Sequence, residues 1–329
     1  MNFLRKIYNK IFYFKIKSGV LEHELGVLGH ELKKWKTNFE PPGHYYSPYP
    51  DPVQLEKQKN LIFQKSAETV LPGIALNTDA QFSLLQQLSA YYTPNIFPFQ
   101  KTAGYRYSFD NQYFCFSDAI FLACMMQQLR PKKIIEIGSG FSSAVMLDVN
   151  EKYFNNSIQL SFIEPFPEDR LNLLVKESDN FTIIKDFVQN VPFGLFQELE
   201  ENDILFIDSS HISKTYSDVN HLIFNIIPLL KKGVIVHFHD IFFPFEYPAE
   251  WMIEQQRAWN EAYLLRSFLQ YNETFVIELF TSYLETKFKE WFISNMPLCL
   301  EKHEKWPKQD GGFYYLETNG QSLYLRKAK

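Results

Sequence analysis

Short apolar runs alternate with amphipathic stretches through the middle of this chain of 329 residues. The runs read KKIIEIG, IQLSFIEP, NFTIIKD, DILFIDS and GVIVHFH, and a stretch compatible with a helix separates each run from the next. Runs of this length, rich in Ile, Val, Leu and Phe, are typical of buried strands. Strands that alternate with helices predict a parallel sheet covered by helices on both faces. Right-handed crossovers place the carboxyl ends of such strands along one edge, where ligands bind.

Further elements flank this alternating region. A helix with Ser117 as its N-cap is predicted before the first run, and another is predicted over residues 260–270. The strand TFVIELF, an insertion that contains Trp291 and Trp306, and a closing strand in SLYLRK follow. The predicted fold class is therefore α/β.

The first 104 residues follow a different pattern. Helices are predicted over residues 18–39, 53–66 and 80–92, and the proline-rich stretch EPPGHYYSPYPDP between the first two is a loop. We therefore divide the chain into two parts. Residues 1–104 form a helical and aromatic N-terminal extension, which could serve as a lid or as a substrate or partner region, and residues 105–329 form the α/β domain.

The first residues, MNFLRKIYNKIFYFKIKSG, are basic and contain no acid. Leu4, Ile7, Ile11 and Phe14 recur at helical spacing, which predicts an amphipathic helix. We expect this helix to pack on its own protein, and peripheral contact with an anionic membrane surface is the alternative. The apolar runs here are too short for a signal peptide.

Charge and cysteine content narrow the classes of function. The chain has 33 basic and 38 acidic side chains and a net charge of −5, so no overall basic field favours nucleic acid. No apolar run approaches the roughly 20 residues of a transmembrane helix. The three cysteines form no CxxC pair and are expected to be reduced thiols in a cytoplasmic protein.

The segment IIEIGSGFSS, residues 134–143, has the pattern of a strand, a glycine turn and a helix. Gly138 and Gly140 allow tight backbone conformations and the close approach of a ligand to a helix N-terminus. Many α/β turns use glycine only to pack a helix against a strand. Ser143 stands where the dinucleotide fingerprint has its third glycine, which argues against a pyrophosphate site.

Acidic residues end the second and third runs. Glu164 follows the second run, and a carboxylate at this position can accept both hydroxyls of an adenosine ribose. Asp186 ends the third run and could reach an adenine amine. An exposed acid at a strand end is the alternative in both cases, but the glycine turn ahead of Glu164 favours a binding site.

Titratable residues gather at the ends of the fourth and fifth runs. Asp208 begins the segment DSSHISKTYSD, and the last run ends in His237, His239 and Asp240. If the two strands are neighbours, Asp208, His239 and Asp240 meet and could form a mononuclear metal site. Alternatively, Asp208 caps a turn while the histidines hydrogen-bond within the core. A histidine ordinarily titrates near neutrality, which suits a general base, so His211 is a candidate for that role, although a local hydrogen bond in a loop would also explain it.

In this order, IIEIGSG, Glu164, DILFIDSSH and PLLKKGVIVHFHDIF resemble the class I S-adenosylmethionine-dependent methyltransferases, specifically a bacterial group with a long N-terminal extension. The resemblance covers residues 105–242 well and the C-terminal strands loosely. It implies a Rossmann-like sheet of seven, mostly parallel strands. It also implies that S-adenosylmethionine lies over the first, second and fourth strand ends.

The resemblance implies roles for individual residues. Residues of the glycine turn would contact the methionine part of the cofactor, Glu164 the ribose, and Asp186 or Phe187 the adenine; the turn residues are Glu136, Gly138, Ser139 and Gly140. Metal-dependent O-methyltransferases place an acid at the Asp208 position, two adjacent ligands at the positions of His239 and Asp240, and a base at the position of His211. The His239 position usually holds an oxygen ligand, so this sequence departs from the family there.

We therefore expect an enzyme that methylates a hydroxyl of a sugar or another small metabolite. His211 would act as the base, and a divalent metal such as Mg, Mn or Zn would assist. A nicotinamide-dependent oxidoreductase is the alternative enzyme, and a cofactor-binding partner protein without catalysis is the alternative from another class. We expect no nucleic-acid partner and a homo-oligomer.

Overall fold

The computed structural model describes residues 39–40, 43–64, 66, 68–111, 113–114, 116–301, 306–307, 313–314 and 320–329. The helices predicted within residues 1–38 lie outside these ranges. The chain divides into two compact units, residues 1–58 and 59–329. Residues 59–104 cluster with the second unit, and a role for residues 1–104 as a lid or partner region stays a prediction.

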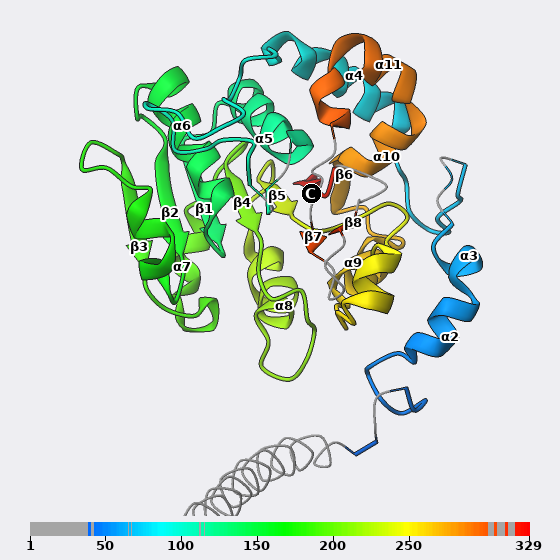
Figure 1. The fold of residues 1–329 in the computed structure, drawn as a ribbon. Helices are drawn as coiled ribbons and strands as arrows, with labels where there is room; N and C mark the ends of the chain where they lie inside the picture. The colour runs from blue at the N-terminus through cyan, green and yellow to red at the C-terminus, as the bar shows by residue number, and fades with distance from the viewer. Residues whose placement is uncertain are drawn as a thin grey trace, which may run out of the picture. The chain divides into compact units, whose positions relative to one another are not determined.

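The second unit contains the predicted seven-stranded sheet, with the order β3-β2-β1-β4-β5-β9-β6 (Figure 1). β9 is antiparallel to both of its neighbours, and every pair formed among β1 to β5 is parallel. The prediction of a mostly parallel sheet is therefore confirmed. The strands are β1 (Lys133–Ile137), β2 (Gln159–Ile163), β3 (Phe181–Ile184), β4 (Ile204–Ile207), β5 (Ile235–Phe238), β6 (Phe275–Phe280) and β9 (Leu323–Lys327), and β7 (Trp306–Pro307) pairs with β8 (Phe313–Tyr314) apart from the sheet.

Helices cover the two faces of this sheet, and Figure 1 shows α5 and α6 on one side and α7 and α8 on the other. Their apolar faces pack against strands that are buried along their whole length, such as β4 and β5. Among the described residues, none of the helices combines the length and the apolar character that a membrane span requires. The α-helices are α2 (Pro52–Lys57), α3 (Lys59–Ile62), α4 (Thr78–Leu88), α5 (Phe116–Leu129), α6 (Phe141–Phe154), α7 (Phe193–Gln197), α8 (Asp218–His221), α9 (Glu261–Leu269), α10 (Thr281–Lys287) and α11 (Lys289–Asn295).

Some local predictions differ from the structure. Ser117 is not an N-cap: it lies within α5, and its hydroxyl donates a hydrogen bond to Glu285. The stretch between β2 and β3, which the sequence pattern made compatible with a helix, forms only two 3-10 turns, at Pro167–Asp169 and Leu171–Leu173. The helical stretch between β4 and β5 begins at α8, continues as a π turn, and ends in a 3-10 turn that contains Pro228.

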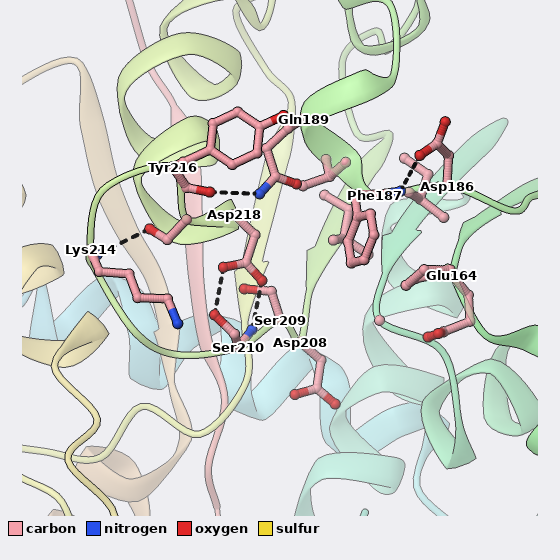
Figure 2. A pocket seen from close by; sticks show the side chains of 16 residues that line it. Glu164, Asp186, Phe187, Gln189, Asp208, Ser209, Ser210, Lys214, Tyr216 and Asp218 are labelled. Atoms are coloured by element: carbon pink, nitrogen blue, oxygen red, sulfur yellow. Dashed lines mark hydrogen bonds between the residues drawn. The ribbon is translucent and has the colours of Figure 1, made fainter. Parts of the chain in front are cut away.

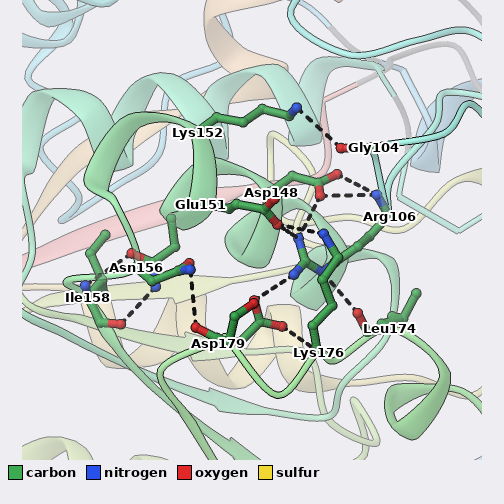
Figure 3. A network of polar contacts seen from close by, with 12 residues as sticks. Gly104, Arg106, Asp148, Glu151, Lys152, Asn156, Ile158, Leu174, Lys176 and Asp179 are labelled. Carbon is green, nitrogen blue, oxygen red and sulfur yellow. Dashed lines mark hydrogen bonds and ion pairs between the residues drawn. The ribbon is translucent and has the colours of Figure 1, made fainter.

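A buried guanidinium joins three parts of the α/β unit (Figure 3). Arg106 precedes α5, and its side chain is 4% exposed. Its Nη1 donates to Asp148 of α6 at 3.1 Å and its Nη2 to Asp179 at 2.6 Å, while its Nε donates to the carbonyl of Leu174 at 2.9 Å. Both acids are almost completely buried. This cluster therefore anchors the segment before α5 to α6 and to the connection between β2 and β3.

Candidate functional site

The glycine turn after β1 is shaped by the end of β4. Gly138 has φ +79°, a conformation that favours glycine, and a Cβ on it would lie 1.9 Å from the carbonyl oxygen of Asp208. The backbone N–H of Asp208 donates to the carbonyl of Ile137 at 2.9 Å, which keeps the two segments together. The sequence explained Gly138 by the approach of a ligand, but in the structure the closest neighbour is this backbone.

The turn also encloses a carboxyl group. Glu136 is completely buried and accepts hydrogen bonds from the hydroxyls of Ser142, at 2.5 Å, and Ser143. Burial raises the pKa of Glu136 to about 8, against the opposing effect of the two serine hydroxyls. The hydroxyl of Ser143 also accepts the N–H of Gly140 at 2.9 Å. Ser143, which the sequence showed only as a missing glycine, thus joins the turn to the buried acid.

The acids predicted at the ends of β2 and β3 are held by hydrogen bonds from backbone N–H groups and, for Asp186, also from a side-chain amide. Glu164 accepts the N–H of Ser139 at 3.1 Å and the N–H of Phe166 at 2.9 Å, one on each carboxylate oxygen. Asp186 accepts the N–H of Phe187 and the side-chain amide of Asn190, both at 2.7 Å. Their carboxylates are therefore fixed at the carboxyl edge of the sheet.

A cavity of about 390 Å³ opens at this edge, next to the glycine turn. Figure 2 shows Glu164, Phe187 and Asp208 around it, with the loop that carries Lys214 and Tyr216 on the opposite side. Five of the residues predicted to hold the cofactor or metal line this cavity. They follow the ends of β1, β2, β3 and β4: Gly138, Glu164, Asp186, Phe187 and Asp208. Glu136, Ser139 and Gly140 do not line it.

This cavity has the features that a nucleoside cofactor needs. Its volume lies within the range of about 300–1,000 Å³ that is usual for ligand pockets. It combines a carboxylate, Glu164, with an exposed aromatic ring, Phe187, which is 55% exposed. A carboxylate can accept ribose hydroxyls, and a ring provides a surface for a base. The residues present therefore fit S-adenosylmethionine.

Acids and histidines meet beside this cavity at the ends of β4 and β5. The Nε2 of His211 lies 3.3 Å from Asp208 and 3.5 Å from Asp240. The Nδ1 of His239 lies 3.5 Å from Asp208 and 3.6 Å from Asp240. Both imidazoles are buried, whereas Asp208 keeps 32% of its side chain exposed. The structure thus brings together all four residues that were predicted as metal ligands or base.

Charges within this cluster shift its pKa values. Burial would raise the pKa of Asp208, but the imidazoles of His239 and His211 outweigh it and hold that pKa well below its usual range. Burial lowers the pKa of His211, but Asp208 and Glu261 outweigh it and raise the pKa to about 10. Burial raises the pKa of Asp240. The carboxylates of the cluster therefore stabilise a positive charge on the neighbouring imidazole of His211.

The donor atoms suit a borderline divalent cation. One ligand atom each from Asp208, His211 and Asp240 lies within 4.8 Å of the others. Both ring nitrogens of the buried His239 lack a hydrogen-bond partner among the described residues. Two carboxylates with an imidazole are ligands that Mn²⁺ and Zn²⁺ accept more readily than Mg²⁺ does. Asp208, Asp240 and His211 therefore fit such an ion, and His239, the predicted nitrogen ligand, is not part of this compact group.

His237 lies apart from this cluster, below the sheet edge. It is completely buried, its Nε2 is 2.9 Å from the hydroxyl of Ser322, and its ring stacks on Phe206 at a centroid distance of 3.9 Å. Burial lowers its pKa well below the usual value. These contacts give His237 a structural role.

One neighbour of the cluster was not indicated by the sequence. Glu261, the first residue of α9, is 1% exposed and places Oε2 at 2.8 Å from the Nδ1 of His211. The ring of Trp259 lies 4.4 Å from the ring of His211. Fifty positions separate Glu261 from His211, and an acid at a helix start is common, so no spacing could have indicated this pair.

The chain is similar to a known protein family, to a protein of an archaeon and to several solved structures. Residues 135–241 match a family model described as a methyltransferase domain. An uncharacterized protein of Archaeoglobus fulgidus is 34% identical over 194 residues, which span 58% of this chain and 85% of that protein. Among solved structures, the O-methyltransferase TomG from Streptomyces achromogenes, in complex with SAM, is 13% identical with a TM-score of 0.37 and covers 84% of this chain and 97% of that one.

A Podospora anserina methyltransferase, solved with SAH bound, is 14% identical with a TM-score of 0.37 and covers 84% of this chain and 96% of that chain. The domain match spans β1 to the end of β5, which is the part of the sheet that carries the glycine turn and the acid–histidine cluster. Residues 135–241 of this chain therefore form a methyltransferase domain, whose strands belong to a seven-stranded, mostly parallel sheet.

Proposed function

We propose that the protein transfers a methyl group from S-adenosylmethionine to a hydroxyl of a small metabolite such as a sugar. The observation that supports this most directly is the double position of Asp208. Asp208 lines the cavity beside the glycine turn, and its carboxylate also contacts the two histidines of the cluster. A cofactor in the cavity and an acceptor at the cluster would therefore be neighbours.

The cofactor would lie along the carboxyl ends of β1, β2 and β4. Glu164 would accept the ribose hydroxyls, and Asp186 and Phe187 would contact the adenine. The methionine part would lie toward the glycine turn, at Gly138, Ser139 and Gly140. Glu136 would act from behind the turn through Ser142 and Ser143, because its own carboxyl group is completely buried. When bound, S-adenosylmethionine supplies a methyl group that its positively charged sulfur has already activated.

The acid–histidine cluster would prepare the acceptor. His211 would take the proton of the acceptor hydroxyl on Nε2, the nitrogen that faces Asp208 and Asp240. These two acids and His239 would hold a divalent cation, which lowers the pKa of a hydroxyl that it contacts. A cation bound by Asp208 and Asp240 would also oppose protonation of His211. It would thereby counteract the neighbouring carboxylates, which otherwise raise the pKa of His211 to about 10. The protein would then need only to align the acceptor with the methyl group.

Binding and transfer can be tested separately. Titration calorimetry with S-adenosylmethionine and with NAD comes first, and we expect S-adenosylmethionine alone to bind. A radiolabelled methyl donor is then offered with a panel of hydroxylated acceptors that includes cell-envelope sugars. His211→Ala should retain cofactor binding and lose about 10²–10⁴ in turnover, the usual share of a general base. A protein that binds NAD and not S-adenosylmethionine would refute the proposal, and full activity in His211→Ala would refute the base.

Dependence on a metal has its own test. Dialysis against a chelator should abolish transfer, and Mn²⁺ or Zn²⁺ should restore it at least as well as Mg²⁺, because an imidazole is among the ligands. Full activity in a metal-free preparation would leave the two acids and the histidines with a purely protein-based role. We also propose a homo-oligomer, which sedimentation would check. The basic N-terminal segment is still expected to pack on its own protein, and flotation with anionic vesicles would reveal the alternative, a membrane contact.

A further inference from the structure

The start of α9 is attached to the backbone of His211. His211 has φ +58°, in the left-handed region, and its carbonyl oxygen accepts the N–H groups of Asn260 at 3.1 Å and Glu261 at 3.2 Å. Asn260 also accepts the N–H of Ser213 at 2.6 Å through its side-chain oxygen and donates to the carbonyl of Ser213 at 3.2 Å. The loop that carries His211 is thus joined to the first residues of α9 on both sides of Ile212.

The side chain of His211 is fixed by the same helix end. Its Nδ1 lies 2.8 Å from Oε2 of Glu261, and both residues are buried. The ring of Trp259 packs on the imidazole at 4.4 Å between centroids. Since Nδ1 is occupied, Nε2 is the nitrogen that faces Asp208 and Asp240, at 3.3 and 3.5 Å.

We propose that Glu261 is a positioning residue that directs the Nε2 of His211 toward the acceptor. This inference rests on the proposed function, in which Nε2 takes the proton. Burial raises the pKa of Glu261, and the hydrogen bond to His211 opposes this. An ionised Glu261 only accepts hydrogen bonds, and Nδ1 would then carry the proton that the two groups share. In the neutral ring, the free electron pair then lies on Nε2. Carboxylates orient catalytic histidines in this way in serine hydrolases.

A different role for Glu261 would be to stabilise the N-terminus of α9 through the helix dipole, which favours an acid in the first turn. Two substitutions separate the roles. Glu261→Leu removes both the charge and the acceptor oxygen, whereas Glu261→Gln removes the charge and keeps an oxygen that can accept from Nδ1. Stabilisation of the helix end depends on the charge and would be lost equally in both. Positioning depends on the acceptor and would be largely retained in Glu261→Gln.

The first measurement needs no acceptor. In protein labelled with ¹⁵N-histidine, the proton on Nδ1 of His211 is identified by its absence from His211→Ala. We expect this proton to be protected from exchange with water in the wild type and in Glu261→Gln, and to be lost from the spectrum of Glu261→Leu. Glu246→Gln is the matched control, because Glu246 hydrogen-bonds Tyr263 of the same helix at 2.5 Å. Persistence of the protected proton in Glu261→Leu would overturn the proposal.

The second measurement is turnover with an acceptor from the panel above. Glu261→Leu should lower turnover by about 10²–10⁴, as loss of the base would, and Glu261→Gln by only about tenfold. Binding of S-adenosylhomocysteine should stay within about twofold of the wild type in both. In a His211→Ala background, Glu261→Leu should cost nothing further, since residues that act as a unit are not additive.

Several results would contradict this assignment. Equal turnover in Glu261→Gln and Glu261→Leu, or a full cost of Glu261→Leu in the His211→Ala background, would assign Glu261 to stabilising the helix end. Should Glu261→Leu fail to fold, Glu261→Ala, which also lacks the acceptor oxygen, takes its place, and a turnover equal to that of Glu261→Gln would refute positioning. A wild-type protein that binds no S-adenosylhomocysteine would refute the proposed function instead, and the ¹⁵N measurement would still decide the role of Glu261.

Discussion

Alanine at Gly138 should damage both the glycine turn and the end of β4. A Cβ at this position would lie 1.9 Å from the carbonyl oxygen and 2.9 Å from the carbonyl carbon of Asp208. These are backbone atoms, so the contact cannot be relieved by a side-chain rotation. The positive φ of +79° adds strain of about 1–2 kcal/mol for any residue with a Cβ. Forcing two backbone segments apart costs about 1–3 kcal/mol more, so the total loss of stability should be about 2–5 kcal/mol.

Alanine substitutions at two other glycines distinguish the cost of backbone strain from the cost of the close contact with Asp208. Gly104 has φ +85°, and a Cβ on it would have no neighbouring atom within 4 Å, so Gly104→Ala should show the strain alone, about 1–2 kcal/mol. Gly140 lies in the same turn as Gly138 but has an ordinary extended φ of −176°. A Cβ there would meet only the guanidinium end of Arg170, which can move. Gly140→Ala should therefore be the mildest of the three.

Urea denaturation gives the three free energies of unfolding, and calorimetry gives the affinity for S-adenosylhomocysteine. We expect Gly138→Ala to lose the most stability and to bind the ligand weakly even where it is folded, because the shift moves Asp208. The reasoning would be refuted if Gly138→Ala were as stable as Gly104→Ala. In that case the close approach of Asp208 would impose no cost, and ligand contact alone would explain the glycine.

Buried groups lead to three further predictions. Arg106→Gln should cost about 3–5 kcal/mol in urea denaturation, because it leaves Asp148 and Asp179 buried without their guanidinium, and a loss below about 1 kcal/mol would contradict this. Burial raises the pKa of Glu136 to about 8, so the native carboxyl keeps a proton that the unfolded chain releases near its usual value of 4.5. Native stability should therefore fall as pH rises from about 4.5 to 8, and Glu136→Gln should abolish that fall. His237→Asn should lower the melting temperature while methyl transfer by the folded fraction stays near wild type, and a loss of transfer without a loss of stability would contradict it.

The positions of the strands were accessible from the sequence because the central strands β4 and β5 are buried along their whole length. Short apolar runs between turn residues favour buried strands, and parallel neighbours bring their carboxyl ends together. The register of Ile207 opposite Phe238 places Asp208 beside His239, as the pattern implied. Glu164 and Asp186 lie at the same edge for the same reason.

Features that depend on contacts distant in the sequence could not be found this way. Glu261 contacts His211 only because α9 packs beside the loop after β4, and no periodicity encodes that placement. The hydroxyl of Ser143 is directed at Glu136 by the first turn of α6, a detail of side-chain geometry. Sequence patterns report which face of an element is apolar, whereas these contacts depend on how separate elements meet.

The placement of Asp208 connects the two halves of the site. Its backbone N–H is bonded to β1, its carbonyl oxygen approaches Gly138, and its carboxylate contacts His211 and His239. The glycine turn and the acid–histidine cluster are therefore held at a fixed spacing by a single residue and its neighbouring strand. Methyl transfer requires the donor carbon and the acceptor oxygen to be close and in line, and rigid spacing of their binding groups supplies much of that alignment in advance. Asp208 would thus contribute through its backbone as well as its charge, so that Asp208→Asn, which keeps the backbone contacts, should preserve cofactor binding while impairing transfer.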